Sequence, residues 1–473
     1  MGRAPALQCS GAASLASWFV GRKASPGIER AAWSGHSNRH LSRPGSDAYN
    51  RAVIRGVLIC GLLLLGCGSS DQPPGGHDPD AGVGDAAPDG TTNDPDGSSS
   101  CAWATQSIQP FLEGVVRSSL VIDAAGLHVS FVSATDGALG FATRASEQAW
   151  TTATIDPFAA GAAHSTLVRD SAGGLHITYA VTTAGELRYA YKPANGTWTK
   201  STIDPFADGV GHSALVVDAS DGLHVTYPAG GELRYAYKPA DGSWTKATID
   251  SFADDVASSS LIVAATGVYV AYAAGGELRF AAKPTSGTWS KTTIDPFAGG
   301  GGQPELALDA SGGLHVTYAA DDELRYATMP ASGTWSKLTI DAFATGAGHS
   351  ALVVDASGDV HVTYTPAGEL RYAYKPAAGT WTKTTVDPFA AGAVHSTLLL
   401  DAAGGLHVSY TPSSQGELRY AYKPAAGTWT KTTIDPFADG AAHSSMALDA
   451  TNHLHVVYGA PTADELRHAE RCL

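Results

Sequence analysis

Short stretches in which apolar and polar residues alternate with a period of two run along the chain from Cys101 to Cys472, and glycine and proline separate them. Within the segment 211–250 this alternation predicts four strands, at 213–218, 223–227, 232–238 and 243–249. We call these positions strands a, b, c and d in chain order. The pattern therefore predicts a series of short antiparallel strands joined by turns.

The same segment recurs along the chain. Tryptophan marks strand d at intervals of 45 to 48 residues, and a Leu-His-Val-like motif marks strand b eight times, with Tyr269 once in place of the histidine. Insertions between strands b and c come as pairs of residues, which keeps each side chain on its own face of the sheet. Four strands in a repeat of about 46 residues are typical of a propeller blade. The sequence predicts an all-β fold, an eight-bladed β-propeller of four-stranded blades over residues 101–473.

A basic residue and a short apolar run precede the repeats, at 53–67. The run predicts a secretion signal, because it is too short for a membrane-spanning helix. Its end, Leu64-Leu65-Gly66-Cys67, resembles the lipobox of bacterial lipoproteins, which implies that Cys67 is acylated and becomes the mature N-terminus. The alternative is an ordinary signal peptide with a cysteine at this place by chance. Residues 1–52 do not fit a signal peptide, so we expect them to be a non-native N-terminal extension.

The lipoprotein resemblance implies an exported protein. Gly68 stands where an inner-membrane retention signal would have Asp, which favours the outer membrane or the cell surface. Residues 68–100 contain seven Asp, many Gly, Pro and Ser, and no Lys or Arg. Such a composition cannot bury enough apolar surface to fold, so we expect a disordered tether. We expect membrane contact through the lipid anchor alone.

Two cysteines remain after the signal and the lipid site, Cys101 and Cys472. Alignment of the copies places them at the two ends of one c–d turn, where the separation suits a disulfide. The last copy lacks its Trp strand and the first begins with one. We therefore expect the N-terminal strand around Trp103 to complete the eighth blade, with a terminal disulfide in place of the turn.

The longest loop of each copy joins strand d to the next strand a and carries an Asp-Pro-Phe-like motif. Long loops on a rigid scaffold commonly carry binding sites. The loops end in residues that would form a polar ring near the mouth of the channel. The candidate ligand-binding residues are Arg117, His164, His212, Gln303, His349, His395 and His443. The alternative, which we favour at this stage, is that these side chains hold one blade to the next.

The c–d turn before each Trp is similar to the Asp-box of sialidase-like propellers. The box Ser and Asp are missing from most copies, so no catalytic residue can be carried over. Sialidases also use arginines from different blades for a carboxylate, whereas the arginines here occupy one repeated c-strand position beside Glu. We expect a repeated contact of Arg with Glu or an aromatic ring. A hydrolase or lyase would instead use the divergent residues Ser258, Gln303 and Glu305.

Charge and repetition narrow the function. The net charge of −15 argues against nucleic acid as a partner. We expect no metal and no cofactor, because most copies cannot supply the oxygens that calcium needs and no zinc pattern is present. Near-identical copies favour a multivalent binding module over an active site. The domain resembles bacterial secreted and surface propeller repeat proteins and, more loosely, propeller lectins, which implies binding to a glycan or another surface polymer. We expect a monomer, and a protein-interaction scaffold is the remaining alternative.

Overall fold

The computed structural model describes residues 102–473, apart from short gaps at 111–116, 134–136, 146–147, 160–161, 300–301, 391–394, 413–415, 439–440, 442 and 461–462. The proposed extension at 1–52, signal at 53–67, acylated Cys67, tether at 68–100 and Cys101 lie outside the described residues. Within the part that the structure describes, no helix has the length and apolar character needed to cross a membrane.

The described residues form eight sheets of four antiparallel strands each. Blade 1 contains β2 (Ser118–Asp123), β3 (Gly126–Val132), β4 (Leu139–Arg144) and β5 (Thr151–Asp156). Blade 2 contains β6 (Ala162–Arg169), β7 (Leu175–Val181), β8 (Glu186–Lys192) and β9 (Thr199–Asp204). Blade 3 contains β10 (Ala214–Val217), β11 (Leu223–Ala229), β12 (Glu232–Lys238) and β13 (Thr245–Asp250). Blade 4 contains β14 (Ser259–Ala264), β15 (Gly267–Ala274), β16 (Glu277–Pro284) and β17 (Ser290–Asp295).

The second half repeats this order. Blade 5 contains β18 (Glu305–Leu308), β19 (Leu314–Ala320), β20 (Glu323–Met329) and β21 (Ser336–Asp341). Blade 6 contains β22 (Ser350–Val354), β23 (Val360–Tyr364), β24 (Leu370–Lys375) and β25 (Thr382–Asp387). Blade 7 contains β26 (Ser396–Leu400), β27 (Leu406–Tyr410), β28 (Leu418–Lys423) and β29 (Thr430–Asp435). Blade 8 contains β30 (Ser444–Leu448), β31 (His453–Ala460), β32 (Glu465–Cys472) and, from the start of the domain, β1 (Ala104–Gln109).

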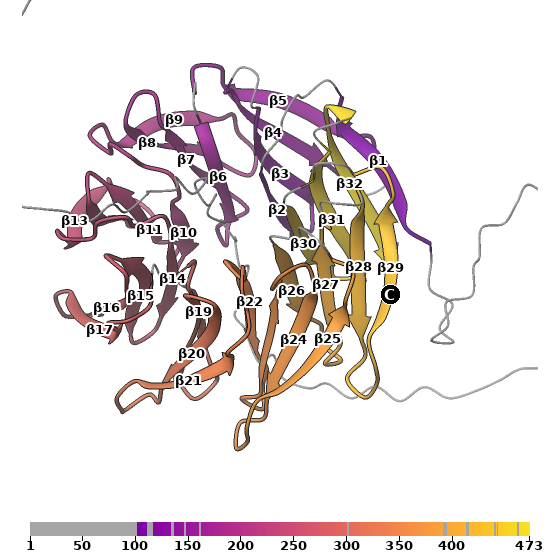
Figure 1. Cartoon of the computed structure of the whole chain (residues 1–473). Helices are drawn as coiled ribbons and strands as arrows, with labels where there is room; N and C mark the ends of the chain where they lie inside the picture. Colours follow the sequence, from indigo (N-terminus) through magenta and orange to yellow (C-terminus); the bar gives the residue numbers. More distant parts are fainter. Residues whose placement is uncertain are drawn as a thin grey trace, which may run out of the picture. The chain divides into compact units, whose positions relative to one another are not determined.

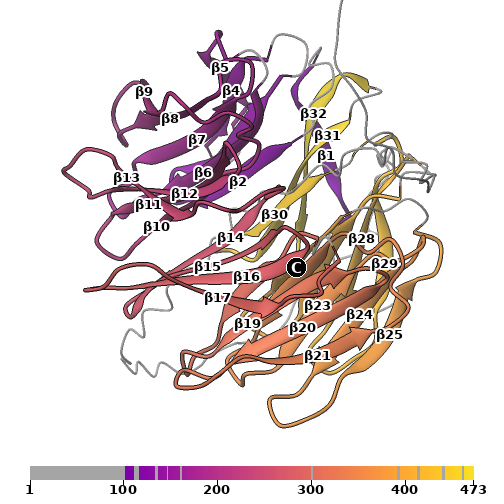
Figure 2. The ribbon, with the colours of Figure 1, turned by 60° about the vertical axis from the view of Figure 1, so that its left-hand side comes forward.

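The blades follow one another around a ring (Figure 1). Each strand a contacts strand a of the next blade, and β30 of the last blade contacts β2 of the first. Strand β1 pairs antiparallel with β32, so that Ala104 lies opposite Glu470, and Figure 2 shows β1 beside the C-terminal strands. The eight-bladed propeller and its closure by the N-terminal strand are confirmed. The disulfide between Cys101 and Cys472 stays a prediction, because Cys101 is not among the described residues.

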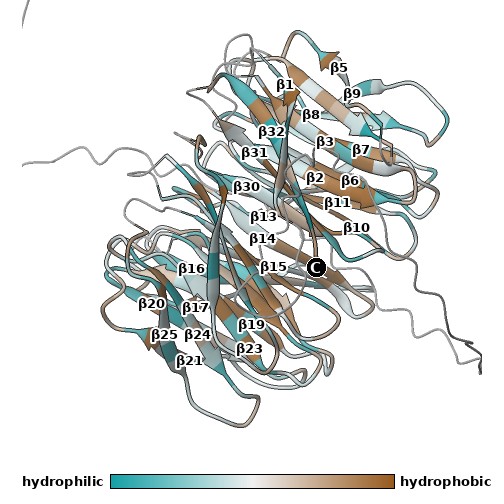
Figure 3. Ribbon diagram, turned by 90° about the vertical axis from the view of Figure 1, so that its right-hand side faces the viewer, coloured by the Kyte–Doolittle hydropathy of each residue, from teal (hydrophilic) through white to brown (hydrophobic). Residues whose placement is uncertain are grey.

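The core lies between the blades. The strands carry both apolar and polar segments (Figure 3), and blade 3 contributes apolar residues to one cluster shared with blade 2 and to another shared with blade 4. One cluster joins Leu233, Tyr235 and Ile249 of blade 3 to Val270 and Tyr272 of blade 4. The Trp289 ring of blade 4 packs edge-on against Tyr235 at 5.1 Å between ring centroids. The repeated tryptophans therefore join the outer parts of adjacent blades.

Candidate binding sites at the blade junctions

Seven of the eight d–a loops begin with a buried aspartate that bonds to the following blade. Asp250 accepts hydrogen bonds from the Tyr272 hydroxyl at 2.9 Å, the Arg279 guanidinium at 2.9 Å and the Lys291 ammonium at 2.6 Å. It also accepts one from the backbone N–H of Phe252, which fixes the turn of its own loop. Burial alone would raise the pKa of Asp250, but the donors, led by Lys291, hold that pKa at about 2. One ionised carboxylate thus joins two blades.

The arginine of strand c holds the loop and a second carboxylate together. A β-bulge precedes Arg279, whose Nε donates to Glu277 at 2.7 Å. Its NH1 donates both to Asp250 and to the backbone carbonyl of Phe252, the latter at 2.7 Å. The expected contact between Arg and Glu is confirmed, whereas the bond to the preceding blade was not predicted. The same Arg–Glu pair recurs in Arg188, Arg234, Arg325, Arg371, Arg419 and Arg467.

These bonds fix the loop backbone in a position that leaves the phenylalanine side chain in solvent. Phe252 is 78 % exposed, although large aromatic side chains are normally buried. The phenylalanines at the equivalent position of the other d–a loops are 69 % to 81 % exposed: Phe158, Phe206, Phe297, Phe343, Phe389 and Phe437. Seven exposed aromatic rings therefore stand at seven equivalent junctions around the described ring.

A small cavity lies beside the exposed ring. It has a volume of ≈ 280 Å³ at the junction of blades 3 and 4, and Phe252, Glu277, Arg279, Lys291 and the threonines of β17 line it. The aromatic ring offers an apolar face, Arg279 and Lys291 offer N–H donors, and Glu277 offers a carboxylate acceptor. This set suits a ligand that combines an apolar face with several hydroxyl groups.

The junction residues are lost together where the ring closes. Between blades 8 and 1, Gln109 replaces the aspartate, Phe131 replaces the tyrosine and Gly140 replaces the arginine. Ala138 replaces the glutamate and Thr152 replaces the lysine, so all five hydrogen-bonding residues are replaced at this junction, although the sequence keeps the phenylalanine as Phe111. Between blades 7 and 8 only the lysine is replaced, by Thr105. This concerted loss is the signal in the sequence from which the junction could have been found.

The seven residues predicted as ligand contacts come together at the channel. They form one chain of contacts from Gln303 through His349, His395, His443, Arg117 and His212 to His164. Arg117 Nε donates to His443 Nε2 at 3.2 Å, and its NH1 lies 2.9 Å from His212 Nε2. These hydrogen bonds join side chains of five blades, which fits the alternative in which these side chains hold the blades together. A role in ligand binding stays a prediction.

Most of these side chains are buried and uncharged. Arg117 is 6 % exposed and His443 is 7 % exposed. Burial, helped by the charge of Arg117, holds the pKa of His443 well below its usual range and lowers the pKa of His164 to about 2. Four neutral imidazoles and the Arg117 guanidinium therefore lie among the described side chains of the channel, where they can hydrogen-bond to one another.

A larger cavity of ≈ 680 Å³ reaches the channel beside the divergent blades. Strands β10 and β14 line it together with Ser258, Gln303, Glu305 and His349. The arginines of strand c are not part of its lining, since each is held by its own Glu and by the Asp of the preceding blade at a separate outer junction. The arrangement therefore differs from the converging arginines that the sialidase-like alternative requires.

No family model matches the chain, and no curated protein matches it either. Solved β-propellers are similar in fold. The Dos1 propeller aligns with a TM-score of 0.53 at 10% identity, covering 79% of this chain and 95% of that one. The SapL1 lectin, solved in complex with alpha methyl fucoside, aligns with a TM-score of 0.36 at 14% identity and 58% and 95% coverage. The polysaccharide lyase Uly1 aligns with a TM-score of 0.40 at 11% identity and 64% and 88% coverage. At these identities the likeness extends to the propeller fold alone.

Proposed function

We propose that the protein is a multivalent carbohydrate-binding module with one sugar site at each of up to seven blade junctions. The observation that carries the proposal is the sevenfold repetition of an exposed phenylalanine beside an Arg–Glu pair. Leaving an aromatic side chain in solvent loses about 1.5–3 kcal/mol of the stabilisation that its burial would give. Seven exposed phenylalanines at equivalent positions therefore need an explanation other than folding stability. A bound ligand would supply it.

The chemistry of the junction favours a sugar over other polymers. A pyranose has a C–H face that can stack on Phe252 and hydroxyls that can accept from Arg279 and Lys291 and donate to Glu277. The net charge of −15 opposes nucleic acid. A hollow of ≈ 280 Å³ is sized for a single sugar residue rather than for a protein surface. Each site would be weak, and avidity would come from their number.

A glycan array with the full chain tests this function. The variant carries Ala at all seven exposed phenylalanines, and because their side chains are 69 % to 81 % exposed we expect it to fold. The control is Leu473→Ala, which removes an exposed apolar side chain that is not at a junction. We expect the parent and the control to bind the same glycans and the seven-fold variant to lose binding. Binding to no sugar, or unchanged binding by the variant, would contradict the proposal.

We further propose that a lipid on Cys67 anchors the module outside the cytoplasm, on the outer membrane or cell surface. The lipobox-like Leu64-Leu65-Gly66-Cys67 and the acidic 68–100 segment support it. An anchored module with many weak sites suits a polymer at the cell surface. Intact-mass analysis of the membrane fraction should find a chain that begins at an acylated Cys67, and Cys67→Ser should release the protein. A membrane form that retains residues before Cys67 would exclude this anchor.

A further inference from the structure

Strand c of blade 8 departs from the repeat at two positions on one face. His468 stands where the other blades have an aromatic residue, and Glu470 stands two residues further on. The equivalents of His468 are Phe141, Tyr189, Tyr235, Phe280, Tyr326, Tyr372 and Tyr420; those of Glu470 are Thr143, Tyr191, Tyr237, Ala282, Thr328, Tyr374 and Tyr422. One blade has therefore gained an imidazole and a carboxylate side by side.

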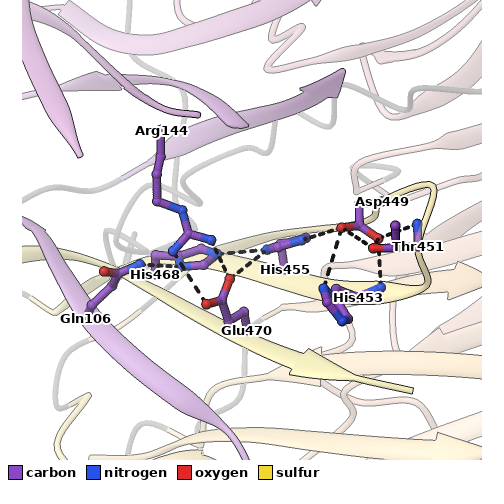
Figure 4. Close-up of polar contacts among 8 residues, drawn as sticks. All are labelled: Gln106, Arg144, Asp449, Thr451, His453, His455, His468 and Glu470. Atoms are coloured by element: carbon purple, nitrogen blue, oxygen red, sulfur yellow. Dashed lines mark hydrogen bonds and ion pairs between the residues drawn. The ribbon is translucent and has the colours of Figure 1, made fainter. Parts of the chain in front are cut away.

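The change alters what the b-strand histidine meets. In five blades Nδ1 of this histidine lies 2.5 to 2.7 Å from the tyrosine hydroxyl opposite. In blade 8, His455 Nδ1 instead lies 3.1 Å from His468 Nε2 and 3.6 Å from Glu470 Oε2 (Figure 4). One ligand atom from each of these three residues lies within 4.8 Å of the other two. His455 and His468 are 3 % and 0 % exposed, while the Glu470 side chain is 34 % exposed and can be reached from solvent.

The surrounding groups set the protonation of both rings. His455 Nε2 faces the Asp449 carboxylate at 3.4 Å, which favours the proton on Nε2. The Gln106 amide satisfies its neighbours when its oxygen accepts from Trp150 Nε1 at 3.2 Å and from Arg144. The same amide position lies 3.3 Å from His468 Nδ1, so that nitrogen also carries its proton.

The two remaining nitrogens, His455 Nδ1 and His468 Nε2, then point lone pairs at each other across 3.1 Å. Two acceptors at this distance, with a carboxylate beside them, repel one another unless a cation lies between them. Each imidazole thus turns one lone pair toward the space that they share with the carboxylate, as a ligating histidine does. Their second nitrogens are held by a carboxylate and an amide, the usual support for ligating histidines.

We propose that His455 Nδ1, His468 Nε2 and Glu470 Oε2 bind a divalent transition metal, with Zn²⁺ as the preferred ion. In tetrahedral zinc sites the bonds are about 2.0–2.2 Å, which places ligand atoms about 3.4 Å apart. The two separations measured from His455 Nδ1, 3.1 Å to His468 Nε2 and 3.6 Å to Glu470 Oε2, bracket that value. Three protein ligands leave a fourth position for water or another ligand. Arg144, which now pairs with Glu470, would share the carboxylate with the metal.

The site lies where the ring closes. Its ligands are on β31 and β32, Gln106 is on β1, and Arg144 is on β4 of blade 1 (Figure 4). A bound ion would therefore brace the junction between the two ends of the domain. We expect Zn²⁺ to raise the melting temperature of the full chain, because a ligand that binds only the folded state stabilises it.

Titration of the full chain with Co²⁺ tests the site, because Co²⁺ bound by nitrogen and oxygen ligands absorbs visible light and Zn²⁺ should displace it. His468→Tyr and Glu470→Tyr restore the residues of blades 2, 3, 6 and 7, so both variants should fold. We expect His468→Tyr to weaken binding by about 100-fold or more and Gln106→Ala by about 10-fold. The control is His453→Ala, which removes a half-exposed histidine beside Asp449 and should leave binding unchanged.

Two results would overturn the site: a parent chain that does not bind Co²⁺ or Zn²⁺, or a His468→Tyr variant that binds them as tightly as the parent. A parallel melting experiment gives an independent readout. The Zn²⁺-dependent rise in melting temperature should be present in the parent and in His453→Ala and absent in His468→Tyr. An equal rise in all three would assign the ion to another place.

Discussion

At seven of the eight junctions a single aspartate of one blade accepts hydrogen bonds from several side chains of the following blade, so few residues carry much of the stability there. Asp295 is 2 % exposed and accepts from Tyr318, Arg325 and Lys337. Removing one donor leaves part of a buried charge unsatisfied, and hydrogen bonds to charged groups contribute about 1.5–3 kcal/mol. The tyrosine hydroxyl is the donor that can be removed with the least other change.

We therefore expect Tyr318→Phe to lower the free energy of unfolding by about 1.5–3 kcal/mol, measured by urea denaturation. The matched control is Tyr237→Phe, since the Tyr237 ring lies tilted 4.8 Å from the His224 ring and its hydroxyl bonds to no other described residue. That variant should change stability little. Equal losses in the two variants would show that the carboxylate does not depend on its tyrosine donor.

At the scale of the strands, the junction between blades 8 and 1 has an apolar contact in place of the hydrogen-bonded Tyr and Arg of the other junctions. Phe131 on β3 lies directly opposite Gly140 on β4. A Cβ at position 140 would meet the Phe131 ring at 2.3 Å, well inside van der Waals contact. Only glycine leaves room for the Phe131 ring at this position, so the replacement of Tyr by Phe131 and that of Arg by Gly140 depend on each other.

Gly140→Ala should lower stability by about 1–3 kcal/mol, the usual range for overpacking. Thermal or urea unfolding measures the loss. Combining Gly140→Ala with Phe131→Leu should recover part of it, because the smaller side chain makes room for the added methyl group. A Gly140→Ala variant as stable as the parent would contradict this account of the junction.

The strands themselves were predictable, because a two-residue period and turn residues repeat eight times. Strand c at 232–238 coincides with β12, and strand d at 243–249 differs from β13 at its ends. Closure by the strand after Trp103 followed from the missing strand in the last copy. The junction sites were harder to predict, since Asp250 and Arg279 meet across two blades and the sequence pattern of one copy does not contain that contact.

The exposure of Phe252 was also beyond the pattern. From sequence alone, an aromatic residue in a loop is expected to pack into the core. The Phe252 ring points outward because the bulge before Arg279 and the bond from Arg279 to the Phe252 backbone carbonyl fix the loop in this position. His468 and Glu470 could have been noticed as departures from Tyr-x-Tyr, but their convergence with His455 depends on the pairing of β31 with β32.

For the whole molecule, buried histidines link stability to pH. Burial holds the pKa values of His212, His395 and His443 well below the usual 6.5. The unfolded chain therefore binds protons that the folded chain does not, and stability falls as pH drops below about 6.5. The junction aspartates, such as Asp204 with a pKa of about 2, add a further loss below about pH 4.

Urea midpoints measured from pH 7.5 to pH 5 should decrease steadily, and His212→Gln should make the decrease smaller. Stability that is constant over this range would show that the channel imidazoles gain protons without unfolding. The same series in Tyr318→Phe should run parallel to the parent, because that change does not alter a histidine.

The repetition of the junction around the ring makes the number of bound sugars the most direct test of the function. Native mass spectrometry of the full chain with a glycan selected on the array should show several ligands per chain, up to seven. The maximum should fall by one in Phe252→Ala and by two when Phe343→Ala is added. A single ligand per chain, or a maximum that these changes leave unaltered, would contradict binding at the blade junctions.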